Sequence, residues 1–133
     1  GAGGGLKAVL VDGGTGTAIA KVAVAASLST ILLGWIVAAL IRLATGSATV
    51  ATVTAAGIVA PLAVHLSQSH LSLLVLSIGA GSLIFSHVND AGFWLVKEYF
   101  GLTVGQTMKT WSMMETVISF MGLAVTMLLS TLM

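Results

Sequence analysis

The sequence predicts an all-α integral membrane fold with a re-entrant helical hairpin, a discontinuous transmembrane helix and a terminal transmembrane helix. Two observations predict the class. Hydrophobic residues make up 57% of the 133 residues and charged residues only 7%, with a mean hydropathy of +1.10, whereas a soluble domain carries about a quarter charged residues. The charges are also widely spaced: twenty uncharged residues separate Lys21 from Arg42, and eighteen follow Glu115. Because a helix needs about 20 apolar residues to cross a bilayer, these runs are suited to lipid.

The composition also excludes several kinds of partner and chemistry. The net charge is +1, so the chain has no strongly basic surface for nucleic acid. The absence of cysteine excludes disulfides, thiolate metal sites and a cysteine nucleophile. His65 and His70 match no helical zinc motif, residues 13–21 lack the P-loop spacing, and residues 14–16 lack the third glycine of a dinucleotide fingerprint. We therefore expect no nucleic acid partner, no metal, no cofactor and no catalytic residues.

Residues 1–21 are expected to form an interfacial connector. A short apolar stretch ends at the sequence Asp12-Gly13-Gly14-Thr15-Gly16, and each glycine weakens a helix by about 1 kcal/mol. Thr17 is a suitable cap for the helix that follows.

Residues 22–66 are expected to form a re-entrant hairpin whose tip lies near residues 45–49. The run from 44 to 54 is small, hydroxylated and rich in β-branched residues, which suits packing against protein or lining a polar cavity better than facing lipid. Thr45-Gly46-Ser47 is a turn signal between two apolar arms. Two full spans are the alternative. We favour a tip at membrane depth, where irregular backbone is tolerated inside protein or around water.

Residues 71–100 are expected to form a discontinuous helix that is broken at residues 86–92. The apolar stretch from Leu71 to Phe85 has only fifteen residues, too few for a full crossing. The aromatic and charged residues over 93–100 then resume a helix in the manner of an interfacial belt.

The chain is expected to end with a connector over 101–109 and a terminal span over 110–133. Trp111 would anchor the entry of this span at the membrane interface. Glu115 lies four residues later, about 6 Å along a helix, so we expect it to stay at the interface as well.

Two polar clusters supply the candidate substrate-binding residues. Ser47, Thr49 and Thr52 lie at the start of the second arm of the hairpin, where backbone amides and the helix dipole attract a carboxylate. Asn89 and Asp90 lie in the helix break, and an Asp at the centre of a membrane helix costs about 2.5 to 3.5 kcal/mol. Capping and packing would explain each residue singly, but they explain the hydroxyl cluster less easily. We therefore assign these five residues to substrate binding.

Asp90 and His87 are also the candidate proton-coupling residues. His87 precedes Asp90 by three residues and shares its face if the turn is helical, and a histidine near an Asp suits proton coupling. A packed histidine is the alternative. Two other functions stay open: Ser82 and His87 as the dyad of an intramembrane hydrolase, which would also need an oxyanion hole, and a structural membrane subunit.

Three stretches of the sequence resemble the C-terminal part of the gluconate permease family of proton symporters. They are Gly3-Gly-Gly-Leu-Lys-Ala-Val-Leu-Val-Asp12, Ser86-His-Val-Asn-Asp-Ala-Gly-Phe-Trp94 and Lys109-Thr-Trp-Ser-Met-Met-Glu-Thr116. The match runs through the whole chain, and the second stretch is the most specific. The resemblance implies secondary active, proton-coupled uptake of gluconate or a related sugar acid by a multi-pass protein of the bacterial inner membrane. It also implies a longer protein, of which this chain is a fragment.

The family in turn resembles a larger group of ion transporters with inverted repeats, each with a re-entrant hairpin and a broken helix that meet at the substrate. The chain would be a second-repeat fragment, with Ser47 to Thr52 at the hairpin tip and His87 to Gly92 at the break. Gly-Ser-Ala-Thr stands at the tip where dicarboxylate carriers of this group have Ser-Asn-Thr, which is consistent with protons as the coupling ion. The implied partners are a small carboxylate substrate, protons, the lipid bilayer, the remaining N-terminal part of the transporter and a second copy in a homo-oligomer.

Overall fold

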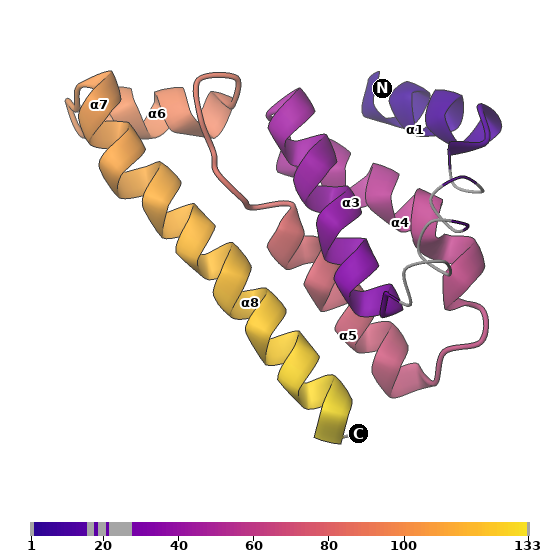
Figure 1. The fold of residues 1–133 in the computed structure, drawn as a ribbon. Helices are drawn as coiled ribbons and strands as arrows, with labels where there is room; N and C mark the ends of the chain where they lie inside the picture. Colours follow the sequence, from indigo (N-terminus) through magenta and orange to yellow (C-terminus); the bar gives the residue numbers. More distant parts are fainter. Residues whose placement is uncertain (1, 16–17, 19–20, 22–27, 133) are drawn as a thin grey trace.

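The computed structural model describes residues 2–15, 18, 21 and 28–132, and every regular element within them is a helix (Figure 1). The first helix, α1 (Ala2–Asp12), packs against the helix α4 that is described below. It ends at Asp12, and Gly14 in the turn that follows has a φ of 75°, a conformation that glycine adopts at little cost. The expected cap at Thr17 and the first residues of the expected hairpin, 22–27, lie outside the described residues.

Two apolar helices, α3 (Thr30–Thr45) and α4 (Ala48–Ala63), are joined by a two-residue turn and pack against each other. Ser29 caps α3 by accepting a hydrogen bond from the Leu32 amide at 3.2 Å. Gly46 ends α3 in the left-handed region with a φ of 70°, and Ser47 caps α4 through the Val50 amide at 3.3 Å. Each helix has sixteen residues and is therefore about 24 Å long, which is shorter than the hydrocarbon core of a bilayer.

The next two helices, α5 (Gln68–Gly81) and α6 (Ala91–Tyr99), are separated by a non-helical segment, residues 82–90. The non-helical segment thus begins four residues before the expected start at residue 86. Phe85 has a φ of 42°, which is unusual for a residue with a bulky side chain. Asp90 caps α6 by accepting a hydrogen bond from the Gly92 amide at 2.9 Å.

One continuous helical run comprises α7 (Val104–Thr107), the π-helical turn η1 (Met108–Ser112) and α8 (Met113–Leu132). With 29 residues it is the one helix in the described part of the chain that is long and apolar enough to cross a membrane. The expected connector over 101–109 is therefore too long, because the helix begins at Val104. Thr103 and Gln106 form a capping box that starts it there.

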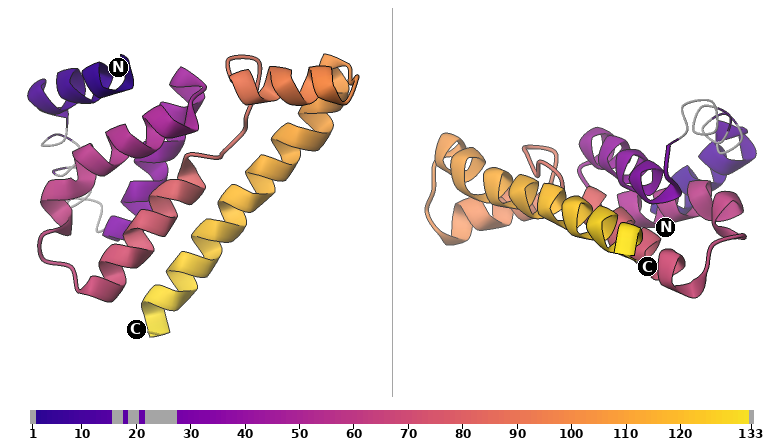
Figure 2. Two further views of the ribbon diagram at one scale, coloured as in Figure 1. Left: turned by 180° about the vertical axis from the view of Figure 1, so that it is seen from behind. Right: turned by 60° about the horizontal axis from the view of Figure 1, so that its bottom comes forward.

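Helix α3 lies between α4 and α5, and α8 runs along α5 (Figures 1 and 2). Two glycines allow the close approach of α3 and α5: a Cβ at Gly34 would lie 2.6 Å from Leu74 Cδ1, and one at Gly81 would overlap the carbonyl of Trp35. Small residues permit such contacts between membrane helices. Trp35 also joins α3 to α8, because its Nε1 donates to the Ser119 carbonyl at 3.2 Å and to the Ser119 hydroxyl at 3.1 Å.

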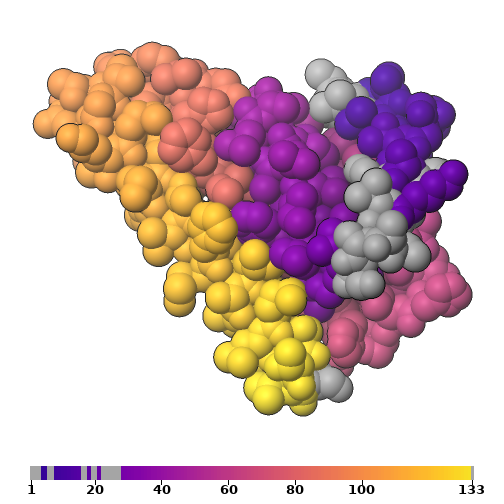
Figure 3. Space-filling view, in the orientation of Figure 1, coloured from indigo at the N-terminus to yellow at the C-terminus, as the bar shows by residue number. Residues whose placement is uncertain are grey.

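The helix α8 forms one flank of the molecule in the space-filling view (Figure 3). It presents a row of exposed apolar side chains, as a surface in contact with lipid or with further transmembrane helices would. These include Val117, Ile118, Met121, Val125 and Leu128.

Candidate functional site

The turn between α3 and α4 lies directly against the non-helical segment between α5 and α6. Asn89 Nδ2 donates a hydrogen bond to the carbonyl of Leu43 at 3.1 Å. A Cβ at Gly46 would overlap the backbone carbonyl of Asn89. Glycine is therefore needed at position 46 both for the positive φ and for the contact between the two segments.

Arg42, in the last turn of α3, is the centre of this contact. The residue is 3% exposed, and its Nη2 lies 2.6 Å from Asp90 Oδ2 and 3.9 Å from Glu115 Oε2. Its Nη1 donates to the carbonyl of Gly46 at 2.5 Å, which ties the arginine to the turn. One buried cation therefore serves two carboxylates, one from the helix break and one from α8.

Asp90 is held by two further donors. The amide of Gly92 and the hydroxyl of Ser86 both donate to its carboxylate. Together with Arg42, these donors give both carboxylate oxygens of Asp90 a hydrogen-bond partner in this arrangement.

The π-helical turn η1 connects α8 to the helix break through Ser86, which is fully buried. Trp111 Nε1 donates to the Ser86 hydroxyl at 2.9 Å, and the Ser112 hydroxyl donates to the Ser86 carbonyl. These consecutive residues both lie in η1; such π turns often occur at functional sites. Trp111, which was expected to anchor the helix at the membrane interface, is also part of the network around Asp90.

These segments line an open cavity of about 440 Å³, within the usual range for small-molecule sites. The start of α4 forms one wall, the helix break a second, and the η1–α8 segment a third. Its charged and polar lining includes Arg42, Ser47, Thr49, Asn89, Asp90 and Glu115.

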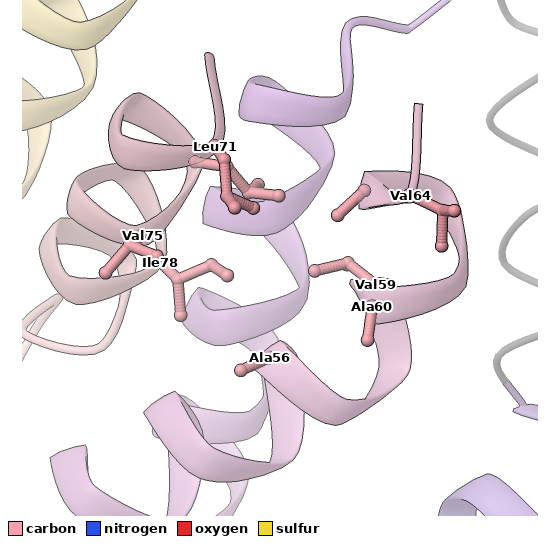
Figure 4. Close-up of a pocket in the computed structure, with 9 residues that line it drawn as sticks. Ala56, Val59, Ala60, Val64, Leu71, Val75 and Ile78 are labelled. Carbon is pink, nitrogen blue, oxygen red and sulfur yellow. The ribbon is translucent and has the colours of Figure 1, made fainter. Parts of the chain in front are cut away.

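A second hollow, of about 330 Å³, lies between α4 and α5 and has a different character (Figure 4). Only alanine, valine, leucine and isoleucine side chains line it, among them Ala56, Val59 and Ile78. Such a lining offers no partner for hydroxyl or carboxylate groups, so it suits acyl chains or apolar side chains. The cavity at Arg42 is the better candidate for a polar ligand.

Four of the five candidate substrate-binding residues line the cavity: Ser47, Thr49, Asn89 and Asp90. The fifth, Thr52, is not among its lining residues, and its hydroxyl donates to the carbonyl of Ala48 at 2.9 Å.

The expected pairing of His87 with Asp90 differs from the arrangement in the structure. His87 Nδ1 lies 2.9 Å from the carbonyl of Phe85, and its ring packs on the Phe85 ring with centroids 5.5 Å apart. Because residues 82–90 are not helical, a spacing of three residues does not put two side chains on one face; Ser86 contacts Asp90 instead. The dyad of Ser82 and His87 is not assembled either, since the Ser82 hydroxyl donates to the Gly79 carbonyl at 2.7 Å.

Sequence reasoning missed Arg42, Ser86 and Glu115 as members of the site. Glu115 was expected at the interface, yet it is 9% exposed and borders the cavity. A signal for Arg42 was present, since it is the only formal charge between Lys21 and Asp90. The membrane cost that makes Asp90 informative applies equally to an arginine.

Comparison with known proteins identifies a family for this chain. The model of the family described as GntP family permease matches residues 1–132. A gluconate permease of Pseudomonas aeruginosa is 59% identical over 98% of this chain and 29% of its own length. A high-affinity gluconate transporter of Escherichia coli is 52% identical over 98% of this chain and 30% of its own length. A Gnt-II system L-idonate transporter of Escherichia coli is 54% identical over 91% of this chain and 27% of its own length.

The chain thus spans less than a third of the length of these relatives. No solved structure matches it. Since the family model covers nearly the whole chain and the relatives are bacterial permeases and transporters, the chain belongs to the GntP permease family, whose members are transporters of the bacterial inner membrane and not enzymes.

Proposed function

We propose that this chain is part of a secondary active transporter that takes up gluconate or a related sugar acid together with protons. The observation that carries the proposal is the cavity at the junction of the hairpin turn, the helix break and α8, with a buried arginine in its wall. A sugar acid has one carboxylate and several hydroxyls, and the lining offers a cation, hydroxyls and an amide as partners. The names of the relatives support the same substrate class.

The helices α3 and α4 form a re-entrant hairpin in this proposal, and the turn at Gly46 and Ser47 is its tip. Each arm is about 24 Å long, too short to cross about 30 Å of hydrocarbon, which supports a turn at membrane depth. Arg42 and Asp90 meet at that turn, and irregular backbone and charges are tolerated there because protein surrounds them. The break between α5 and α6 is the matching discontinuous helix.

The substrate hydroxyls bind to Ser47, Thr49 and Asn89, which approach the cavity from two different segments. Thr52 is left out of this set because its hydroxyl is used by the Ala48 carbonyl. Asp90 borders the cavity and is the proposed proton-coupling carboxylate. His87 stays a second candidate for proton transfer, although its ring contacts Phe85.

The test is uptake of labelled sugar acids by the full-length permease that contains this chain, reconstituted in sealed vesicles with an imposed pH gradient. Gluconate, idonate and a neutral sugar would be compared. We expect accumulation of one or more sugar acids only when protons flow inward with them, and loss of accumulation when a protonophore removes the gradient. A permease that accumulates none of the acids, or does so independently of the proton gradient, would contradict the proposal.

A further inference from the structure

The charges that border the cavity do not balance. Arg42 carries one positive charge, and Asp90 and Glu115 carry two negative charges when both are ionised. Helix α4 contributes no titratable group to the cavity wall. His87 is turned toward Phe85, and Lys97 is paired with Glu98 at 2.7 Å. With both carboxylates ionised, the site has a net charge of −1 before any substrate enters it.

The hydrogen-bond donors of the Arg42 guanidinium are also only partly engaged. Its Nε is buried and has no hydrogen-bond partner among the described residues. Asp90 contacts it through one oxygen, on Nη2, and Glu115 at 3.9 Å is beyond hydrogen-bond distance. An arginine binds a carboxylate best through two parallel hydrogen bonds, so the Asp90 contact leaves part of this capacity free.

A sugar acid that enters this cavity brings a third carboxylate to the same cation. Without compensation the buried net charge would become −2, and burying unpaired charge is costly. One proton taken up with each substrate molecule restores the net charge to −1. The displaced carboxylate is the natural acceptor, since it loses the cation that stabilised its charged form.

We propose that Arg42 is the residue that binds the substrate carboxylate, and that the substrate displaces Asp90, which then takes up the transported proton from the medium. The inference rests on the proposed function and deepens it. Substrate and proton favour each other's binding because both act on Arg42: a proton on Asp90 frees the arginine, and a substrate on the arginine raises the affinity of Asp90 for a proton. Such coupling is reciprocal by thermodynamic necessity.

The test compares two variants of the full-length permease, Asp90→Asn and the double variant Arg42→Gln/Asp90→Asn. The asparagine can still cap α6, and the double variant removes both charges of the Arg42–Asp90 pair, leaving Glu115 as the one carboxylate of the cluster without its cation. Protein abundance and thermal unfolding are therefore measured for both variants. The single variant Arg42→Gln is avoided because it would leave Asp90, whose side chain is only 14% exposed, without its cation. The probes are gluconate and glucitol, the neutral alcohol of the same chain length, measured by calorimetry at pH 6 and pH 8.

We expect wild-type binding of gluconate to weaken from pH 6 to pH 8, by up to about tenfold per pH unit for one linked proton. Asp90→Asn should remove this dependence and bind gluconate about tenfold or more tightly than wild type at pH 8, because Arg42 no longer has a competitor. The double variant should bind gluconate at least about 30-fold more weakly than Asp90→Asn. Glucitol should bind to both variants with the same affinity.

Equal gluconate affinities for the two variants would overturn the role of Arg42, and weaker binding by Asp90→Asn than by wild type at pH 8 would overturn the displacement of Asp90. In both cases proton-driven uptake by the wild-type permease would still stand, so the proposed function would survive. A wild-type permease that neither binds gluconate nor accumulates any sugar acid would overturn both proposals.

Discussion

Gly46 offers the sharpest test of the contact between the hairpin turn and the helix break. An alanine there meets two separate obstacles: a φ of 70° and the backbone carbonyl of Asn89. The left-handed conformation costs an L-residue roughly 1–2 kcal/mol, and the overlap adds overpacking of on the order of 1–3 kcal/mol. We therefore expect Gly46→Ala to destabilise the permease by about 2–5 kcal/mol.

Gly101 supplies a matched control. It has a φ of 61°, but a Cβ there would meet nothing within 4 Å. Gly101→Ala should therefore cost only the conformational part, roughly 1–2 kcal/mol. The difference between the two variants isolates the contact with Asn89.

Thermal unfolding of the purified full-length permease and gluconate binding would be measured for both variants. Movement of Asn89 would also shift Asp90 away from Arg42, and a charged hydrogen bond is worth about 1.5–3 kcal/mol. We therefore expect gluconate affinity to change by about tenfold or more in Gly46→Ala and to stay unchanged in Gly101→Ala. Equal losses of stability and unchanged affinity in both would refute the reasoning.

Three further predictions concern the topology of the hairpin, the hydroxyls at its turn and the carboxylate of Asp90. Single cysteines at Lys21 and His70, in a background without other cysteines, should react with an impermeant reagent from the same face of the membrane; labelling from opposite faces would make residues 43–66 an ordinary span. Ser47→Ala and Thr49→Val should each weaken gluconate binding by about 1–3 kcal/mol at normal protein abundance, and unchanged affinity in both would reduce these residues to capping and packing. Asp90→Asn should reach the membrane at normal levels and lose proton-driven accumulation while keeping exchange of substrate down its own gradient; accumulation at the wild-type rate and pH dependence would make Asp90 structural.

The parts of the fold that depend on local chemistry could be predicted from the sequence. Thr45-Gly46-Ser47 contains both the residue that ends α3 and the residue that caps α4, so the turn was found at the right place. Asp90 combines a high membrane cost with a capping side chain, which made it a candidate for the site, and the short apolar stretch before it predicted the interruption of the helix. Thr103 and Gln106 have the spacing of a capping box, which indicates a helix start at Val104. The polar composition of 101–109 led us to predict a connector there instead.

The rest of the site depends on tertiary packing, which a single sequence does not reveal. Glu115 and Arg42 are 73 positions apart and come together because α8 packs along α5 and contacts α3. The direction of His87 follows from the non-helical backbone after Phe85, so helical spacing gave the wrong neighbour for Asp90. The π-helical turn that brings Trp111 and Ser112 to Ser86 has no comparable signature in residue spacing.

The close contact between Gly81 and the carbonyl of Trp35 sets the distance between α5 and α3, the two helices that position the site. Gly81 ends α5 just before the helix break, and Arg42 lies two turns beyond Trp35 on α3. A side chain at position 81 would increase the distance between α3 and α5 and so separate Arg42 from Asp90, although it would not contact a bound molecule itself. Selection for permeases with altered substrate range should therefore recover substitutions of Gly81, because they change the shape of the binding site without changing a residue that lines it.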